Sequence, residues 1–156
     1  MNEEKTFLVQ LREHYGILHK ITCIYAEDAH DREDLAQEIQ YQLWKSYAGF
    51  RGECRFSTWM YRIALNTALG RIRRRRVPLL YPRKLPDPPS EPPDDERVAQ
   101  LFAALRRLPR SDRAVIALHL EDLTLAEIAS VLGITPTHAG VKIHRAKNKL
   151  KTLLNP

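Results

Sequence analysis

The chain has 156 residues, which is enough for one ordinary domain or two small ones. Its formal net charge of +6 and its pI near 9.5 favour an anionic partner, such as nucleic acid or a membrane surface. No apolar run approaches the roughly 18 residues that span a bilayer, and the N-terminus lacks a basic segment followed by an apolar core, so we expect a cytoplasmic protein without membrane insertion.

The first predicted helix covers residues 5–26. Five residues recur there at helical spacing, and their face should pack against the helices that follow: Leu8, Leu11, Tyr15, Leu18 and Thr22.

Two features near this helix suggest a metal or cation site. His19 and Cys23 lie one turn apart, but two ligands without a second pair are a weak metal signal, and the other cysteine, Cys54, stands at no metal-ligand spacing. We therefore expect no metal site, and reduced thiols. The acidic cluster at residues 27–34 is better explained as a helix start capped by Asp31 than as a cation site.

The second predicted helix covers residues 34–47. One side is a core stripe of Leu35, Ile39, Leu43 and Tyr47, joined by Ala36. Aromatic side chains among acids and amides on the opposite side are typical of a partner-binding surface. The alternative is that a neighbouring helix covers Trp44, and both interpretations hold if only part of the ring is covered. The residues of this candidate surface are Asp34, Gln37, Glu38, Tyr41, Trp44 and Lys45.

The third predicted helix begins with Ser57 as N-cap and Phe56 in the staple position before it. It is apolar on most sides, except for a strip where Arg62, Asn66 and Arg73 project within about 40° of one another, with Trp59 at its edge and residues 74–76 following. Cations, an amide and an aromatic ring in one line favour binding of a single nucleic-acid strand. The alternative is a solvated polar strip, which the four-arginine run makes less attractive.

The stretches DLAQEIQYQLWK, FRGECRFSTW and YRIALNTAL resemble region 2 of bacterial RNA polymerase sigma factors of the sigma-70 family, specifically the extracytoplasmic-function (ECF) group. The resemblance implies that the helix at 34–47 docks on a coiled coil of the polymerase largest subunit. It also implies that the following turn and helix bind and melt the promoter hexamer nearer the start site. The candidate DNA contacts are then Phe56, Trp59, Arg62, Asn66, Arg73 and Arg74.

Residues 77–96 hold seven of the ten prolines, a density that forbids a regular helix and predicts a stiff, extended linker. Charge also changes there. Residues 1–76 carry 13 basic and 10 acidic side chains, the linker 2 and 5, and residues 97–156 carry 10 and 4. We therefore predict two basic domains, 1–76 and 97–156, on either side of an acidic linker.

The C-terminal domain should begin with a helix on which Val98, Leu101, Phe102 and Leu105 recur, followed by a helix at 111–120 that buries Val115, Ile116 and Leu118. Thr124 and Glu127 have the spacing of a capping box, with Leu123 and Ile128 as staple. Gly133 should end that short helix, and Thr135 with Pro136 should start the next. This order predicts a helix-turn-helix.

The last helix, Pro136 to about Leu154, should bury Ala139, Ile143, Ala146, Leu150 and Leu153. Its opposite face combines small or polar side chains with cations, with Lys149 flanking it, which is typical of a recognition helix. The alternative is a merely solvated basic face. The candidate DNA contacts are Thr137, His138, Val141, Lys142, His144, Arg145 and Asn148.

The stretch LTLAEIASVLGITPTHAGVKIHRAKNKLK resembles region 4 of the same sigma family, which binds the farther promoter hexamer. Relatives commonly carry Val, Lys and Ser where this chain has Pro136, Gly140 and Val141, so base preference stays open. We expect an all-α fold of two small helical domains and the minimal two-domain type of sigma factor.

The two resemblances predict a promoter-specificity subunit with polymerase core and promoter DNA as partners; an anti-sigma factor is a further partner of many members. The alternative is a stand-alone helix-turn-helix regulator that uses residues 97–156, with the N-terminal half for dimerisation. An enzyme is not expected, because the sequence has no nucleophile with a histidine partner, no glycine-rich phosphate loop and no metal-ligand set.

Overall fold

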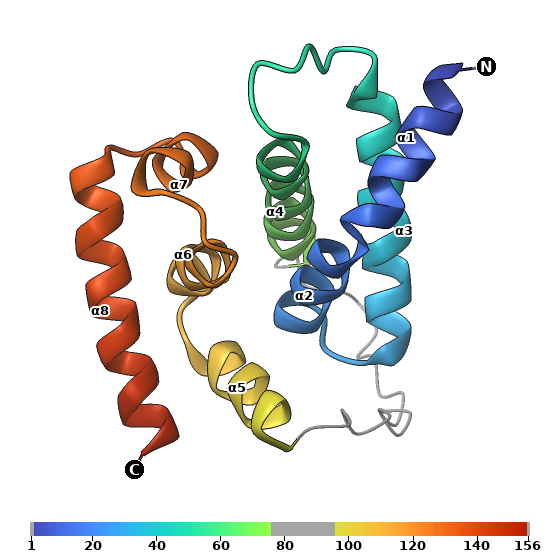
Figure 1. Cartoon of the computed structure of the whole chain (residues 1–156). Coiled ribbons are helices and arrows are strands. Elements are labelled where there is room, and N and C mark those ends of the chain that lie inside the picture. Colours follow the sequence, from blue (N-terminus) through green and yellow to red (C-terminus); the bar gives the residue numbers. More distant parts are fainter. Residues whose placement is uncertain (1, 76–95, 156) are drawn as a thin grey trace. The chain divides into compact units, whose positions relative to one another are not determined.

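The computed structural model describes residues 2–75 and 96–155. These ranges contain eight helices and no strand, which confirms the predicted all-α fold (Figure 1). The chain divides into two compact units, Met1–Ser90 and Glu91–Pro156. The predicted proline-rich linker lies almost entirely outside the described residues, so its conformation stays a prediction.

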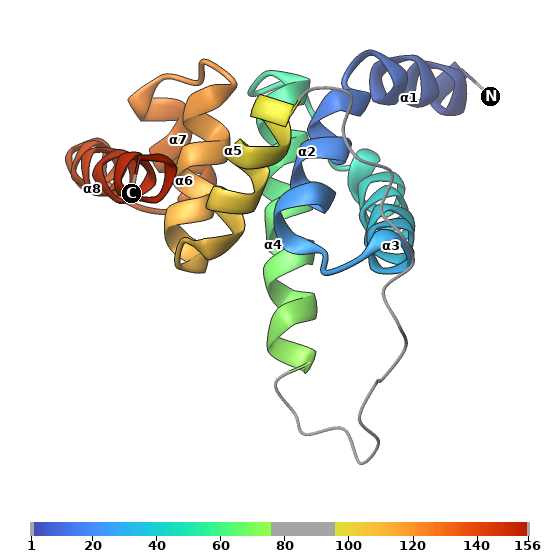
Figure 2. The same cartoon turned by 90° about the horizontal axis from the view of Figure 1, so that it is seen from below.

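The N-terminal unit begins with two helices where the sequence predicts one. Helix α1 (Asn2–Glu13) and helix α2 (Tyr15–Tyr25) are separated at His14, which has φ −110° and ψ 19°, and the two change direction there (Figure 2). The His14 ring nitrogen Nδ1 lies 2.8 Å from the Gln10 carbonyl oxygen, which helps to hold the break. Because the helical phase is interrupted, Leu8 and Tyr15 are exposed instead of buried, and Phe7 takes the core position.

Helix α3 (Ala29–Tyr47) starts earlier than predicted, because its N-cap is Asp28 and not Asp31. The Asp28 side chain accepts a hydrogen bond from the Asp31 backbone N–H at 2.7 Å. Asp31 is therefore in the first turn, where it is buried. The predicted core stripe is confirmed at Leu35, Ile39 and Leu43, which are almost completely buried.

Helix α4 (Phe56–Arg75) packs against α3 and α2 (Figures 1 and 2). Its first helical hydrogen bond runs from the Trp59 N–H to the Arg55 carbonyl oxygen at 3.1 Å. Ser57 thus lies inside the helix, and its predicted capping role is wrong. Burial on several sides is confirmed by the residues that are least exposed: Met60, Tyr61, Ala64, Leu65 and Ala68.

The C-terminal unit contains α5 (Glu96–Arg107), α6 (Arg110–Leu120), α7 (Leu125–Leu132) and α8 (Pro136–Leu154). Helix α6 lies at its centre and is buried continuously from Ala114 to Leu118. On α5 only Ala104 and Leu105 are buried, while Val98 is exposed. On α8 the expected burial holds at Ala139, Ile143 and Ala146; the other two predicted core leucines are only half-buried.

The helix-turn-helix formed by α7 and α8 has the local signals that the sequence predicts. The Glu127 N–H donates to Thr124 Oγ1 at 3.2 Å, and the Thr124 N–H donates to Glu127 Oε1 at 3.1 Å, which completes the capping box. Gly133 ends α7 with φ +70°, a left-handed conformation that favours glycine. Thr135 Oγ1 then accepts from the His138 N–H at 3.1 Å and caps α8.

Candidate protein- and nucleic-acid-binding surfaces

The outer face of α3 carries two exposed aromatic rings. Tyr41 is 62% exposed and Trp44 is 46% exposed. Phe7 from α1 covers one side of the indole, with ring centroids 5.1 Å apart, so both sequence-based interpretations of Trp44 hold in part. Gln37 and Lys45 are exposed beside the rings, and Asp34 and Glu38 are partly exposed. The structure thus brings all six candidate residues onto one accessible face, called here the α3 face.

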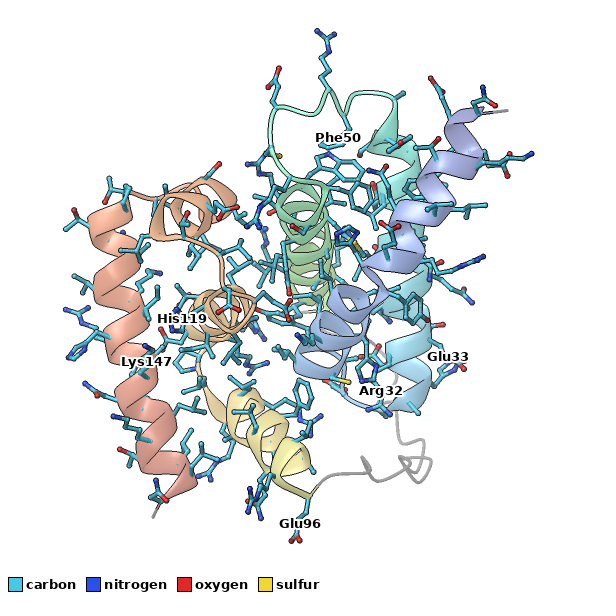
Figure 3. The ribbon with its side chains drawn as sticks, viewed as in Figure 1. Arg32, Glu33, Phe50, Glu96, His119 and Lys147 are labelled. Atoms are coloured by element: carbon cyan, nitrogen blue, oxygen red, sulfur yellow. The ribbon has the colours of Figure 1, made fainter. Side chains whose placement is uncertain are left out.

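An aromatic cluster lies under the turn between α3 and α4, where Figure 3 labels Phe50. The Trp59 ring packs against Phe50, Phe56 and Tyr47 with centroids 4.9, 5.3 and 6.1 Å apart. Trp59 is only 8% exposed and Phe56 7%. In this structure neither ring offers a free face to a base, contrary to the expectation for Trp59. A helical wheel treats one helix at a time, so it could not show that Phe50 and Tyr47 fold over Trp59.

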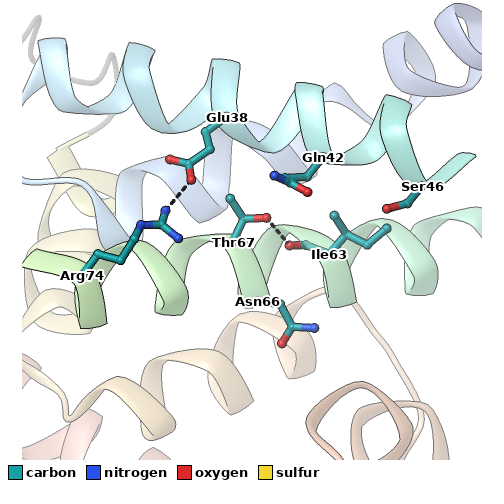
Figure 4. A pocket seen from close by; sticks show the side chains of 7 residues that line it. All are labelled: Glu38, Gln42, Ser46, Ile63, Asn66, Thr67 and Arg74. Carbon is teal, nitrogen blue, oxygen red and sulfur yellow. Dashed lines mark hydrogen bonds and ion pairs between the residues drawn. The ribbon is translucent and has the colours of Figure 1, made fainter.

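The polar strip of α4 is accessible for most of its length. Asn66 and Arg73 are exposed, and Arg62 is half-buried. Figure 4 shows the Asn66 amide directed away from α3. Arg74 is also exposed, but its guanidinium is held by Glu38 on α3, with Arg74 Nη2 2.5 Å from Glu38 Oε1. These four side chains are called here the α4 strip; all are at least partly exposed to solvent, and Arg74 is engaged by Glu38.

A groove of about 350 Å³ runs between α3 and α4 (Figure 4). Helix α3 contributes Glu38, Gln42 and Ser46 at one-turn intervals, and α4 contributes the other lining residues, Ile63, Asn66, Thr67 and Arg74. The groove was not predicted, because it depends on how the two helices pack. Its lining combines amide and hydroxyl side chains with the apolar Ile63, and the ion pair of Glu38 with Arg74 bridges it.

Another ion pair joins the first turn of α3 to the last part of α4. Arg71 Nη2 lies 2.6 Å from Asp31 Oδ1, and the side chains are only 14% and 8% exposed. Asp31 Oδ2 also accepts from the Glu27 N–H at 3.0 Å. The sequence pattern favours Asp31 as a cap over a cation ligand and does not single out Arg71. This buried contact fixes the end of α4 from which Arg73 and Arg74 project.

The outer face of α8 is exposed as the helix-turn-helix prediction requires. Of the seven candidate residues, Lys142 is half-buried and the other six are exposed, namely Thr137, His138, Val141, His144, Arg145 and Asn148. Lys149, expected to flank this face, instead donates from Nζ to Asp112 Oδ2 at 2.9 Å and ties α8 to α6. A methyl group added at Gly140 would meet its nearest neighbour, a Leu125 methyl carbon, at 3.9 Å, so a larger residue would fit there.

Within the described residues, no cluster of three or more metal-ligating side chains occurs. His19 Nε2 and Cys23 Sγ lie 3.7 Å apart on α2, and residues 2–75 and 96–155 place no third ligand beside them. None of the helices in the described part of the chain is long and apolar enough to cross a membrane.

The second unit thus contains a helix-turn-helix, and the described part of the first has four helices, with an aromatic face and a cationic strip on adjacent helices. Residues 11–77 match the family model of Sigma-70 region 2, and residues 99–150 match that of Sigma-70 region 4. The chain belongs to the sigma-70 family of RNA polymerase sigma factors, and its curated relatives place it in the ECF group.

Two of these relatives are mycobacterial. The ECF RNA polymerase sigma factor SigG of Mycobacterium tuberculosis is 32% identical, over 80% of this chain and 42% of that protein. SigE of Mycolicibacterium smegmatis is 30% identical, over 92% of this chain and 60% of that protein. The chain therefore spans about half the length of these relatives. SigW of Bacillus subtilis is 28% identical, over 81% of this chain and 77% of the length of SigW.

Two solved structures share the fold. CnrH, determined in complex with the cytosolic domain of CnrY, has a TM-score of 0.70 at 20% identity and covers 97% of this chain and 89% of its own. The sigma factor RpoE from Bartonella quintana, determined with the anti-sigma factor NepR, has a TM-score of 0.70 at 18% identity and covers 97% and 95%.

Proposed function

We propose that this protein is a dissociable promoter-specificity subunit that directs RNA polymerase core to particular promoters and assists DNA melting. The observation that carries the proposal is the pairing of two different exposed surfaces on adjacent helices, in a unit of the sigma-70 family. The α3 face suits a protein, since half-exposed aromatic rings supply interface energy. The α4 strip suits a nucleic-acid strand, since its cations attract phosphates.

In this proposal the units have separate tasks. Residues 1–76 dock on the coiled coil of the polymerase largest subunit through the α3 face and bind the hexamer nearer the start site through the α4 strip. Residues 97–156 place α8 in the major groove of the farther hexamer, where its exposed polar and basic side chains reach base edges and phosphates. Residues 77–96 link the two. The protein itself breaks and forms no covalent bonds, and it acts in the bacterial cytoplasm, where polymerase and promoters are found.

The buried aromatic cluster changes the proposed strand contacts. With Trp59 covered by Phe50 and Tyr47, the α4 strip holds the strand through Arg62, Asn66 and Arg73. Trp59 can stack on an extruded base only after the turn that carries Phe50 moves. Extruding a base costs a few kcal/mol, which phosphate and amide contacts must offset.

We also propose that an anti-sigma factor can hold this chain away from polymerase. One fold neighbour was determined with an anti-sigma factor and another with a cytosolic domain of a second protein. The exposed aromatic α3 face is a surface that such an antagonist would cover.

Transcription with purified core enzyme tests the proposal. Start sites mapped after overexpression identify a promoter, which is then transcribed by core with and without the purified chain. We expect co-elution with core and initiation only when both are present. A stand-alone regulator would instead bind its operator tightly without core, so a gel shift with and without core separates the two functions. Failure to co-elute with core and to start transcription would refute the proposal.

A further inference from the structure

The ion pair between Glu38 and Arg74 joins two surfaces that the proposed function treats as separate. Glu38 belongs to the α3 face and Arg74 to the α4 strip, yet Arg74 Nη2 lies 2.5 Å from Glu38 Oε1 (Figure 4). The Glu38 side chain is 31% exposed and the Arg74 side chain 66%, so solvent and an incoming partner can reach both.

The path of the Arg74 side chain indicates a directed contact. Arg74 lies one residue from the end of α4, where its side chain could extend into solvent. It instead folds back along the helix, with Nη1 only 3.8 Å from the place where a Gly70 side chain would begin, and reaches across the groove to α3. In the free chain, one cation of the α4 strip is therefore occupied by an acid of the α3 face.

We infer that the Glu38–Arg74 pair is a latch that couples polymerase docking to strand binding. When a polymerase cation engages Glu38, Arg74 loses its partner and becomes available to a phosphate of the strand. When a phosphate takes Arg74, Glu38 becomes available to polymerase. The two binding events then favour each other by the same factor, as thermodynamic linkage requires. This inference rests on the proposed function, because it takes the two surfaces as the binding sites.

The size of the coupling follows from exposure. Ion pairs open to solvent contribute at most about 1 kcal/mol, so the latch should lower strand affinity of the free chain by about two- to fivefold. A larger factor would require a buried pair, and the exposure of Arg74 excludes one.

A double-mutant cycle on the full chain tests the latch. A fluorescein-labelled single-stranded oligodeoxynucleotide of mixed sequence serves as probe, and its anisotropy gives the dissociation constant for the unaltered chain, Glu38→Gln, Arg74→Gln and the double variant. Glu33→Gln is the matched control, because Glu33 is an exposed acid on the same helix and its loss changes net charge equally (Figure 3). Far-UV circular dichroism checks that every variant keeps its helices.

The latch predicts that Glu38→Gln tightens binding of the probe by about two- to fivefold, more than Glu33→Gln does, and only when Arg74 is present. With saturating polymerase core the advantage should disappear, because docking has already removed Glu38 from Arg74. An equal gain in probe affinity from Glu38→Gln and Glu33→Gln would overturn the latch. So would a coupling between Glu38 and Arg74 that persists when core is bound. If core neither binds the unaltered chain nor raises its affinity for the probe, the proposed function fails as well.

Discussion

Breaking the buried ion pair of Asp31 and Arg71 should destabilise the first unit far more than removing a solvent-exposed charge would. Asp31→Asn removes the charge that compensates Arg71, whose side chain is only 14% exposed. Losing one partner of a buried ion pair typically costs about 3–5 kcal/mol. We expect about 3 kcal/mol, the lower end, because an amide oxygen can still accept from the Glu27 N–H and Asp34 lies 3.9 Å from Arg71.

Urea unfolding monitored by tryptophan fluorescence measures this loss of stability. The chain has two tryptophans, Trp44 and Trp59, and both lie in the first unit, so the signal reports that unit alone. With a slope near 1 kcal/mol per molar urea, the midpoint should fall by about 3 M.

Asp34→Asn is the matched control, because it removes a half-exposed carboxylate beside the same arginine and should cost less than about 0.5 kcal/mol. Replacing both partners by apolar residues, Asp31→Leu with Arg71→Met, should restore most of the lost stability, since no buried charge is left unpaired. Equal midpoint shifts for Asp31→Asn and Asp34→Asn would refute the reasoning.

Three further outcomes are expected. Burial raises the pKa of Tyr61, whose hydroxyl has no hydrogen-bond partner among the described residues, so Tyr61→Phe should stabilise the first unit by about 1 kcal/mol in urea unfolding. Above pH 10 the gain should grow, because the unfolded tyrosine ionises there while the folded one stays protonated; equal stability of both proteins at all pH values would contradict this. Gly140→Ala should raise the stability of the second unit by about 0.5–1 kcal/mol in thermal unfolding, because the site has room for a methyl group; a loss would show that glycine is required. The double variant Arg62→Ala with Asn66→Ala should reduce promoter opening, measured by permanganate footprinting, without weakening the binding of core. Trp44→Ala should instead weaken the binding of core without a direct effect on promoter opening. The opposite pattern would mean that the two surfaces are exchanged.

The helix-turn-helix could be predicted nearly residue by residue, because its signals are local. A capping box needs only Thr124 and Glu127 three positions apart, and the left-handed end of α7 needs only Gly133. Such geometry is settled within one turn of helix. The same local reasoning placed the exposed rings of the α3 face, since the periodicity of Leu35, Ile39 and Leu43 fixes which side is buried.

Several predictions failed because residues outside the pattern that was considered decided the outcome. A single helix over residues 5–26 fits the sequence period, but the break at His14 turns Leu8 and Tyr15 outward. Asp31 has the chemistry of a cap, but Asp28 precedes it and Arg71, forty positions away, supplies a stronger partner. Trp59 looks accessible on an isolated helix and is covered by residues from the turn before it.

The arginines near the end of α4, Arg71 and the run that begins at Arg73, are not a uniform patch of charge. Arg71 is committed to Asp31 inside the fold, and Arg74 is shared with Glu38 in the free chain. Among the arginines of this run whose side chains the structure describes, Arg73 is the one with no acidic partner. Each phosphate of a single strand that is neutralised steepens the slope of log affinity against log salt concentration by about 0.7. The free chain should therefore show a shallower slope than the number of arginines in the sequence implies. With polymerase core bound, the slope for the unaltered chain should be about 0.7 steeper than that for Arg74→Gln, because core releases Arg74 to a phosphate of the single strand.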